Sequence, residues 1–220
     1  MTDAQSLNVT EIFYSIQGES LFAGYPCAFV RLSGCPLRCK WCDTLHAQEE
    51  SQDSKKMTFS EVLSTLRTFN SKLVEVTGGE PLAQQMTIPF LKLLINTGYR
   101  VLLETNGAED IAFVPIEVHV VMDIKCPSSG MHERMNLANI VQLKRTDEIK
   151  FVIGSHDDFT YAVKLIKKHS LQERCSLVFS PVSSGLPLEE LASLLLRSGV
   201  YARLQVQLHK VIWGSDCRGV

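Results

Sequence analysis

The sequence has no excess of basic residues and no long apolar segment. Its 220 residues include 22 Lys and Arg and 24 Asp and Glu, a net charge of −2, so it lacks the basic patch expected of a nucleic-acid-binding protein. No apolar run approaches the ~20 residues that a membrane-spanning helix needs, and the first residues lack the basic and then apolar pattern of a secretory signal. We therefore expect a cytoplasmic protein with one domain over residues 1–220.

The sequence also lacks the composition of a disordered or fibrous chain, because 45% of its residues are apolar and 21% are charged. An evenly spaced, even-numbered set of cysteines is absent as well. There are seven cysteines, and Cys35, Cys39 and Cys42 are close together. This grouping favours thiolate ligands in a reducing compartment over a disulfide framework. The four isolated cysteines are assigned no chemistry.

Short apolar runs alternate with amphipathic helical patterns along the chain. Residues 58–61 form a capping box, and apolar residues follow it at helical spacing. Other runs, such as 118–122, are apolar throughout apart from one histidine, as in strands buried on both faces of a parallel sheet. The expected strands are 27–32, 72–77, 100–105, 118–125, 148–153, 176–180 and 203–208, and the expected helices are 59–69, 81–96, 157–169 and 188–197.

This alternation predicts an α/β fold with a parallel sheet. About seven strands are fewer than a closed (β/α)8 barrel requires, so we expect a partial, open TIM-like barrel of the (β/α)6 type. A doubly wound open sheet has the same periodicity and remains an alternative. Polar sequences follow most of the strands, among them 35–44, 77–81 and 104–107. A single composite site is therefore expected at the carboxyl ends of the strands.

Cys35, Cys39 and Cys42 have the spacing C-x3-C-x2-C. Three thiolates on one short loop can hold three irons of a [4Fe–4S] cluster, which four thiolates normally hold. No fourth cysteine lies nearby in the sequence, so the fourth iron is expected to bind a small molecule. A zinc site completed by His46 is the alternative, but structural zinc sites commonly use spaced pairs of ligands.

This triad, Trp41 before its last cysteine, and the sequence Gly-Gly-Glu-Pro at 78–81 together resemble the radical S-adenosylmethionine superfamily. Further motifs are similar to those of the 7-carboxy-7-deazaguanine synthase family: Ile-Gln-Gly-Glu at 16–19, Arg31, Cys-Asp-Thr at 42–44, Glu-Thr-Asn-Gly at 104–107, Asp-Ile-Lys at 123–125 and Gln-Leu-His-Lys at 207–210. The resemblance covers residues 11–220. It implies conversion of 6-carboxy-5,6,7,8-tetrahydropterin to 7-carboxy-7-deazaguanine with loss of ammonia, in queuosine and 7-deazapurine biosynthesis.

The resemblance implies three cofactors, namely a [4Fe–4S] cluster, S-adenosylmethionine and Mg²⁺. A 5′-deoxyadenosyl radical would take hydrogen from C6 of the pterin and later recover it. A flavodoxin-like electron donor and a homodimer are implied as well. Two alternatives remain open: an activase of the same superfamily that forms a glycyl radical on a partner protein, and a non-catalytic iron–sulfur or zinc protein.

The resemblance also assigns residues to roles. The cluster ligands are Cys35, Cys39 and Cys42, and Thr44 is the ligand of Mg²⁺. The implied substrate contacts are Ile16, Gln17, Gly18, Glu19, Arg31, Thr77, His209 and Val220, of which Glu19 and Arg31 are catalytic together with Thr44. The implied contacts of S-adenosylmethionine are Trp41, Cys42, Asp43, Gly78, Gly79, Glu80, Asp123, Lys125 and Ser180, with Glu80 receiving the ammonium group.

Arg31 is a charged residue in an otherwise apolar strand. A guanidinium group can bind a carboxylate through two parallel hydrogen bonds, and the resemblance implies that this carboxylate belongs to the pterin. The alternative is a pairing with a structural acid such as Glu80, since a buried charge needs a partner in either case.

Overall fold

The computed structural model describes residues 5–49, 54–183, 185–214 and 217–220. Its strands are β1 (Ser6–Ile16), β2 (Pro26–Leu32), β3 (Lys55–Thr58), β4 (Leu73–Gly78), β5 (Arg100–Thr105), β6 (His119–Ile124), β7 (Glu148–Ile153), β8 (Ser176–Pro181) and β9 (Arg203–Leu204). Its α-helices are α1 (Phe59–Leu66), α2 (Thr87–Asn96), α3 (His156–His169), α4 (Leu188–Ser198) and α5 (Leu208–Trp213). No helix within these ranges is long and apolar enough to span a bilayer.

The strands form one sheet in the order β3-β1-β2-β4-β5-β6-β7-β8-β9. β1 is antiparallel to both of its neighbours, and every pair from β2 to β9 is parallel. The parallel strands follow one another in chain order, without the reversal that defines a doubly wound sheet. That alternative is therefore wrong, and the predicted open TIM-like barrel is confirmed.

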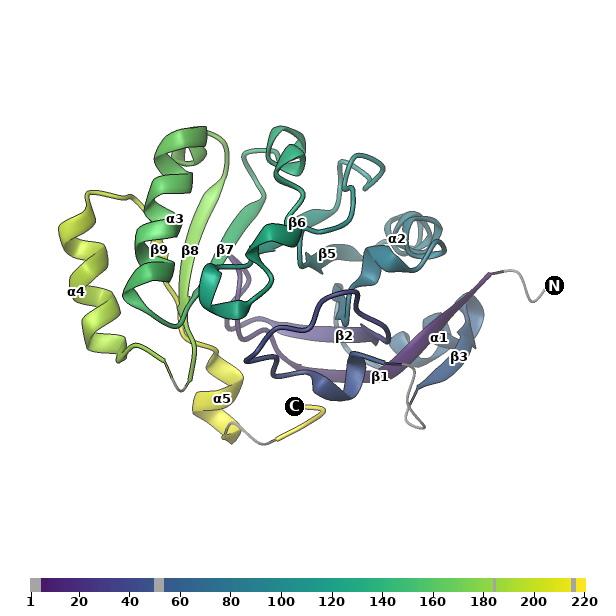
Figure 1. Cartoon of the computed structure of the whole chain (residues 1–220). Helices are drawn as coiled ribbons and strands as arrows, with labels where there is room; N and C mark the ends of the chain where they lie inside the picture. The colour runs from purple at the N-terminus through teal and green to yellow at the C-terminus, as the bar shows by residue number, and fades with distance from the viewer. Residues whose placement is uncertain (1–4, 50–53, 184, 215–216) are drawn as a thin grey trace.

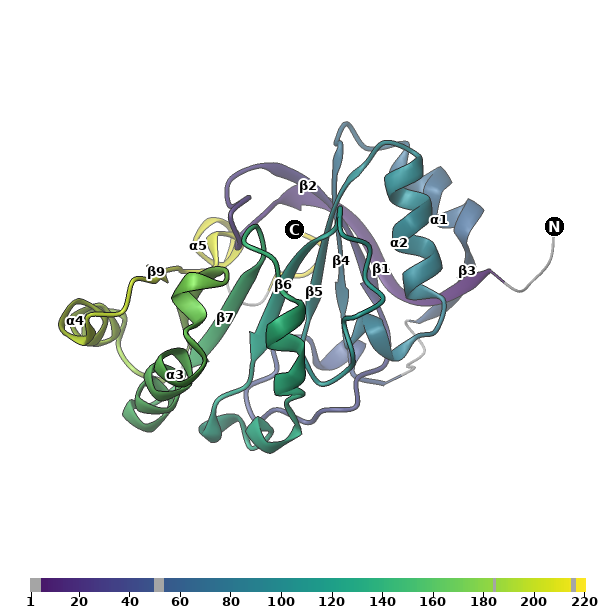
Figure 2. The ribbon, with the colours of Figure 1, turned by 90° about the horizontal axis from the view of Figure 1, so that it is seen from above.

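The curved sheet separates two apolar layers (Figures 1 and 2). On its outer face, where α1, α2 and α3 pack, Val74, Val76 and Phe90 belong to the main hydrophobic core. Alternate residues of the same strands point to the inner face. There Phe29 and Leu102 belong to a second, smaller apolar cluster. This inner cluster lies inside the barrel, beneath the cavity that Phe29 lines.

Most predicted elements are confirmed, and the differences have local causes. The capping box forms as expected, because Thr58 Oγ1 accepts from the backbone N–H of Glu61 and the Glu61 carboxylate accepts from the backbone N–H of Thr58. The helix predicted over 81–96 is wrong in its first part, since Pro81–Ala83 is a 3-10 turn and α2 begins at Thr87. The last predicted strand is too long, because β9 ends at Leu204 and α5 follows.

The loop between β1 and β2 reaches across the opening of the barrel to its last strands. The backbone N–H of Leu21 donates to Glu148 at 2.7 Å, and that of Ser20 donates to Gln205 at 3.1 Å. The backbone N–H of Leu208 donates to the Gly18 carbonyl at 3.1 Å. The first and last parts of the sheet are thus joined by hydrogen bonds of this loop. The motif at 16–19 is thereby fixed inside the barrel, where Gln17 contacts Glu75 and Glu19 contacts Lys150.

Candidate active site

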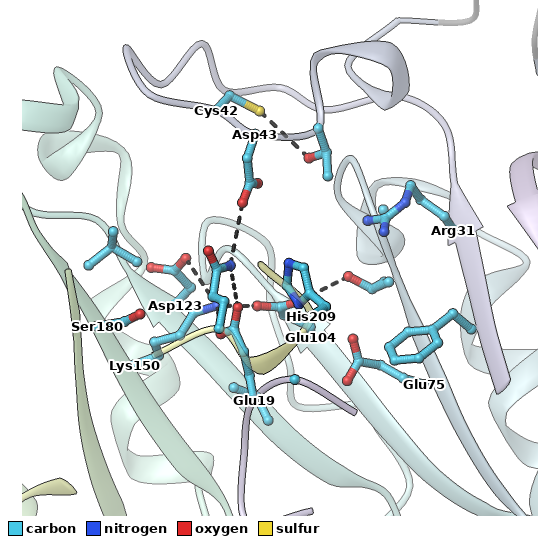
Figure 3. Close-up of a pocket in the computed structure, with 18 of the residues that line it drawn as sticks. Glu19, Arg31, Cys42, Asp43, Glu75, Glu104, Asp123, Lys150, Ser180 and His209 are labelled. Atoms are coloured by element: carbon cyan, nitrogen blue, oxygen red, sulfur yellow. Dashed lines mark hydrogen bonds and ion pairs between the residues drawn. The ribbon is translucent and has the colours of Figure 1, made fainter. Parts of the chain in front are cut away.

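A cavity of about 690 Å³ opens at the carboxyl ends of the strands, on the inner side of the sheet. Figure 3 shows its labelled side chains arriving from separate strands and loops. All site residues predicted from the sequence line this cavity, with the exception of Glu80: Ile16, Gln17, Gly18, Glu19, Arg31, Cys35, Cys39, Trp41, Cys42, Asp43, Thr44, Thr77, Gly78, Gly79, Asp123, Lys125, Ser180, His209 and Val220.

The cysteine loop follows β2 and is half-buried at one rim of the cavity. Asn106 Nδ2 donates to Cys35 Sγ at 3.5 Å. Burial raises the pKa of the Cys35 and Cys39 thiols, and the Cys42 thiol raises both further. All three cysteines line the same cavity. No preformed cage of three His, Cys, Asp or Glu side chains exists among the described residues, so the cluster assignment depends on spacing and family.

The glycines of the Gly-Gly-Glu-Pro motif let the end of β4 pack closely against the start of the cysteine loop. A Cβ on Gly78 would lie 2.1 Å from the Leu32 carbonyl oxygen, and one on Gly79 would lie 2.2 Å from that of Gly34. Gly78 also has a φ of 135°, a value that other residues rarely adopt. The backbone of β4 thus meets both the cavity and the loop that carries the thiols.

Glu80 is the predicted cofactor contact that the structure places away from the cavity lining. It is completely buried and does not line the cavity. Its carboxylate accepts hydrogen bonds from the backbone N–H of Leu82 at 3.0 Å, from Thr105 Oγ1 at 2.8 Å and from the backbone N–H of Asn106 at 2.7 Å. Because both oxygens accept hydrogen bonds inside the protein, Glu80 ties the loop after β4 to the end of β5.

An acceptor suited to the cofactor lies on β6 instead. Asp123 is buried, and its Oδ2 accepts from Lys125 Nζ at 2.8 Å, but its Oδ1 has no hydrogen-bond partner in the described structure. Burial alone would lower the pKa of Lys125, but the adjacent Asp123 carboxylate raises it, so the lysine stays charged. A buried unpaired oxygen is costly, and an ammonium or hydroxyl group of S-adenosylmethionine would pair it.

Arg31 faces the opposite side of the cavity from Asp123 (Figure 3). Its Nε donates to Glu11 Oε1 at 2.7 Å, and its guanidinium group lies over the Phe13 ring at 5.6 Å. The structural acid is thus Glu11 on the neighbouring strand, and Glu80 is not its partner. No described residue accepts a hydrogen bond from the two terminal nitrogens of Arg31. These nitrogens are available to a carboxylate in the cavity.

A buried charge network lies at the centre of the cavity, and its lysine is not among the residues predicted from the sequence. Lys150 Nζ on β7 contacts Glu104 and lies 2.8 Å from Glu19 Oε2. Thr77 Oγ1 donates to Glu104 at 3.1 Å. Burial would lower the pKa of Lys150, but Glu104 and Glu19 raise it well above its usual value, so it stays protonated. The network fixes two predicted substrate contacts, Glu19 and Thr77, relative to each other.

The remaining predicted residues lie near the rim. Thr44 Oγ1 is 3.6 Å from Cys42 Sγ, beside the cysteine loop. Asp43 Oδ2 lies 3.0 Å from Lys210 Nζ. Burial raises the pKa of Asp43, but the charge of Lys210 outweighs this effect and lowers the pKa to about 2. His209 packs against Gly18, where a Cβ would lie 2.5 Å from Nδ1. Burial lowers the pKa of His209, which favours the neutral imidazole.

Comparison with known proteins agrees with this geometry. Residues 29–136 match the Radical SAM superfamily. The chain is 44% identical to the 7-carboxy-7-deazaguanine synthase of Chlorobaculum tepidum, with all of both chains covered. It is 37% identical to that of Koribacter versatilis, with 97% of this chain and 100% of the relative covered. The crystal structure of QueE from Escherichia coli superposes with a TM-score of 0.76 at 24% identity, over 92% of this chain and 94% of that one.

The open barrel and its cysteine loop define a radical S-adenosylmethionine enzyme, for which a [4Fe–4S] cluster and S-adenosylmethionine are the cofactors. At full-length identities of this size, the chain belongs to the 7-carboxy-7-deazaguanine synthase family.

Proposed function

We propose that this chain converts 6-carboxy-5,6,7,8-tetrahydropterin to 7-carboxy-7-deazaguanine with release of ammonia. The observation that carries the proposal is that the cysteine loop and the free end of Arg31 face one cavity. An activase for a partner protein needs no such enclosed carboxylate-binding group. The names of the full-length relatives support the same activity.

Each part of the cavity has a distinct task in this proposal. Cys35, Cys39 and Cys42 hold the cluster, and Asp123 accepts a hydrogen bond from S-adenosylmethionine. When bound to the cluster, that cofactor supplies the radical that removes hydrogen from the substrate. Arg31 holds the pterin carboxylate through two charge-assisted hydrogen bonds. This orientation would direct C6, which carries the carboxylate, toward the cofactor.

The charge network then acts on the rest of the substrate. Glu19 is held by Lys150 and by Gln207, whose Nε2 donates to it, so its carboxylate has little freedom to move. His209, which is favoured in its neutral form, offers both a donor and an acceptor. These fixed groups bind and orient the pterin ring without reorganising during the reaction.

A magnesium ion at Thr44 belongs to this proposal. Mg²⁺ takes oxygen ligands and keeps few protein contacts, which suits a single hydroxyl beside the cavity. The ion would neutralise substrate carboxylate charge and polarise the group as a Lewis acid. A flavodoxin-like electron donor and a homodimer complete the proposal on the basis of the family resemblance.

Anaerobic reconstitution followed by product analysis tests the function. We expect about four irons and four sulfides per chain and a product with the mass of 7-carboxy-7-deazaguanine when the carboxytetrahydropterin, S-adenosylmethionine and a reductant are supplied. Cys39→Ala should form no product, whereas Cys175→Ala, a buried cysteine away from the cavity, should keep its cluster. A reconstituted protein that leaves the pterin unchanged would favour the activase alternative. A colourless protein that holds zinc would contradict both the synthase and the activase.

A further inference from the structure

Glu75 is a buried acid that the proposed mechanism does not use. It lies on β4, is 6% exposed and lines the cavity. Gln17 Nε2 donates to its Oε2, and Gln17 Oε1 accepts from the backbone N–H of Glu19 at 3.0 Å. No described residue donates a hydrogen bond to Glu75 Oε1. The residue thus has one oxygen held by the protein and one oxygen free at the edge of the cavity.

The register of the sheet places Glu75 deeper in the cavity than the residues that face the mouth. Phe29 pairs with Glu75, and Arg31 pairs with Thr77. Glu75 therefore lies two residues further down its strand than Thr77, or about 6.6 Å at ~3.3 Å per residue. A fused two-ring heterocycle has dimensions of this order. A ligand that reaches Arg31 with one end can reach Glu75 with the other.

The surroundings of Glu75 are suited to a flat ring. The Phe13 and Phe29 rings stack at 4.7 Å and line the cavity next to it. In Figure 3, Glu75 and Arg31 lie on one side of the cavity, and Asp123, Lys150 and Ser180 lie on the other. Ser180 and Asp123 are predicted contacts of the cofactor. Glu75 is therefore on the side assigned to the substrate.

Several charged groups surround Glu75, but among the described residues its carboxylate accepts a hydrogen bond from Gln17 alone. The charged groups that face it are Glu104 from β5, Glu19 from the β1–β2 loop, Lys150 from β7 and Arg31 from β2. Burial, followed by Glu104, raises its pKa to about 8, against the lowering effects of Gln17 and Lys150. A ligand that brings N–H donors would favour the carboxylate.

We propose that Glu75 binds the N3–H and 2-amino edge of the pterin while Arg31 binds the carboxylate at the other end. This inference deepens the proposed function and rests on it. The two donors of that edge match the two oxygens of a carboxylate, as in other bidentate pairs. The pyrimidine ring that carries this edge is the same in the pterin and in the deazaguanine. Glu75 would then bind substrate and transition state equally, which lowers KM and leaves kcat unchanged.

Glu75→Gln tests this assignment in the reconstituted holoenzyme. Glutamine keeps the size and the contact with Gln17 but offers one donor and one acceptor in place of two acceptors. We expect KM for the carboxytetrahydropterin to rise roughly 10- to 100-fold, the cost of a mismatched charge-assisted hydrogen bond, with kcat within about threefold. Glu173→Gln, at an exposed position outside the cavity, should change neither constant.

A substrate analogue gives a sharper test. Replacing the 2-amino group by oxygen converts the donor edge to one donor and one acceptor, which opposes a carboxylate and matches glutamine. The unaltered enzyme should prefer the amino compound by more than tenfold in kcat/KM, and Glu75→Gln should reduce or reverse that preference. KM of the unaltered enzyme should also fall as pH rises from 6.5 toward 8, relative to the variant, because only the variant lacks the titrating acid.

The outcomes separate the two proposals. If the unaltered enzyme forms no deazaguanine at any substrate concentration, the proposed function fails. If it forms product and Glu75→Gln has the same KM and the same preference between the two compounds, the assignment of Glu75 is wrong. A variant that loses kcat at unchanged KM would also contradict it, because the contact would then act only in the transition state. Thermal unfolding of the variant at pH 7 checks that the fold is intact.

Discussion

Two buried glutamates, five residues apart, occupy different environments. Burial raises the pKa of Glu75 to about 8 and that of Glu80 to about 7. Three donors from the protein bind the Glu80 carboxylate, and it does not line the cavity. One donor binds Glu75, which does line it. Burial and a raised pKa therefore do not identify a ligand-binding acid by themselves. The number of donors already supplied by the protein distinguishes the two.

The positions of the two glutamates differ from the positions that the sequence suggested. Glu80 belongs to a recognisable motif and was assigned to the cofactor, whereas Glu75 belongs to no motif and was assigned nothing. Glu80 joins the loop after β4 to the end of β5 through hydrogen bonds from Thr105 and Asn106. The unassigned residue faces the ligand space. The following predictions test this distinction, beginning with the largest expected effect.

The stability of the protein should depend on pH through Glu75. Its pKa is raised in the folded protein from an ordinary value of 4.5 to about 8, so its stabilising contribution is present below pH 4.5 and is lost as pH rises toward 8. The slope is at most about 1.4 kcal/mol per pH unit for one proton. Glu75→Gln cannot ionise, so its stability relative to the unaltered protein should increase over this range and then level off.

Urea unfolding of both proteins at several pH values between 5 and 9 measures this difference. The contribution of Glu80 is common to both proteins and cancels. A stability difference that does not change with pH would show that Glu75 ionises normally in the folded protein.

Glu80→Ala should destabilise the fold by about 3 kcal/mol, because it leaves buried donors of Leu82, Thr105 and Asn106 without an acceptor. Glu80→Gln keeps one acceptor and should lose less. Denaturant unfolding measures stability, and equilibrium binding measures affinity for S-adenosylmethionine. An alanine variant of normal stability that no longer binds the cofactor would restore the role predicted from the sequence.

Arg31→Ala should raise KM for the carboxytetrahydropterin about 100-fold, the value of roughly 3 kcal/mol lost with two charge-assisted hydrogen bonds. Reductive cleavage of S-adenosylmethionine without product should persist, because Asp123 lies on the other side of the cavity and the cysteine loop keeps its own three thiols at the rim. Arg31→Lys keeps the charge but not the two parallel hydrogen bonds, so its KM should lie between those of the unaltered enzyme and Arg31→Ala. Loss of both activities together would contradict a role confined to the substrate.

The fold could be predicted where apolar runs were continuous. β5 and β7 have the predicted bounds, because their residues are buried by helices outside and by the barrel inside. β1 was missed because it is only partly buried along its length and pairs antiparallel at one end of the sheet. The start of α2 was misplaced because the Glu80 side chain caps a separate short turn, which periodicity does not reveal.

The motifs predicted which residues line the cavity, apart from Glu80, but they did not reveal single charges within strands. Glu75 is the only charged residue of β4, and Lys150 lies between the apolar residues Ile149 and Phe151 of β7, a signal like the one that identified Arg31. Applied evenly, that signal would have found all three. The pairing of Arg31 with Glu11 depends on the register between β1 and β2, and that information is in the tertiary structure alone.

Thr44 is the predicted metal ligand that is not a cysteine, and its substitution should have the smallest effect. Its hydroxyl lies 3.6 Å from Cys42 Sγ and could serve the loop or a metal ion. A single Mg²⁺ ligand is expected to contribute about tenfold to turnover, or ~1.4 kcal/mol, so Thr44→Ala should weaken stimulation by added Mg²⁺ to that extent. Thr44→Ser, which keeps the oxygen, should retain it. Titration of turnover with Mg²⁺ separates the two roles, because a hydroxyl that only supports the loop would lower activity equally at every Mg²⁺ concentration.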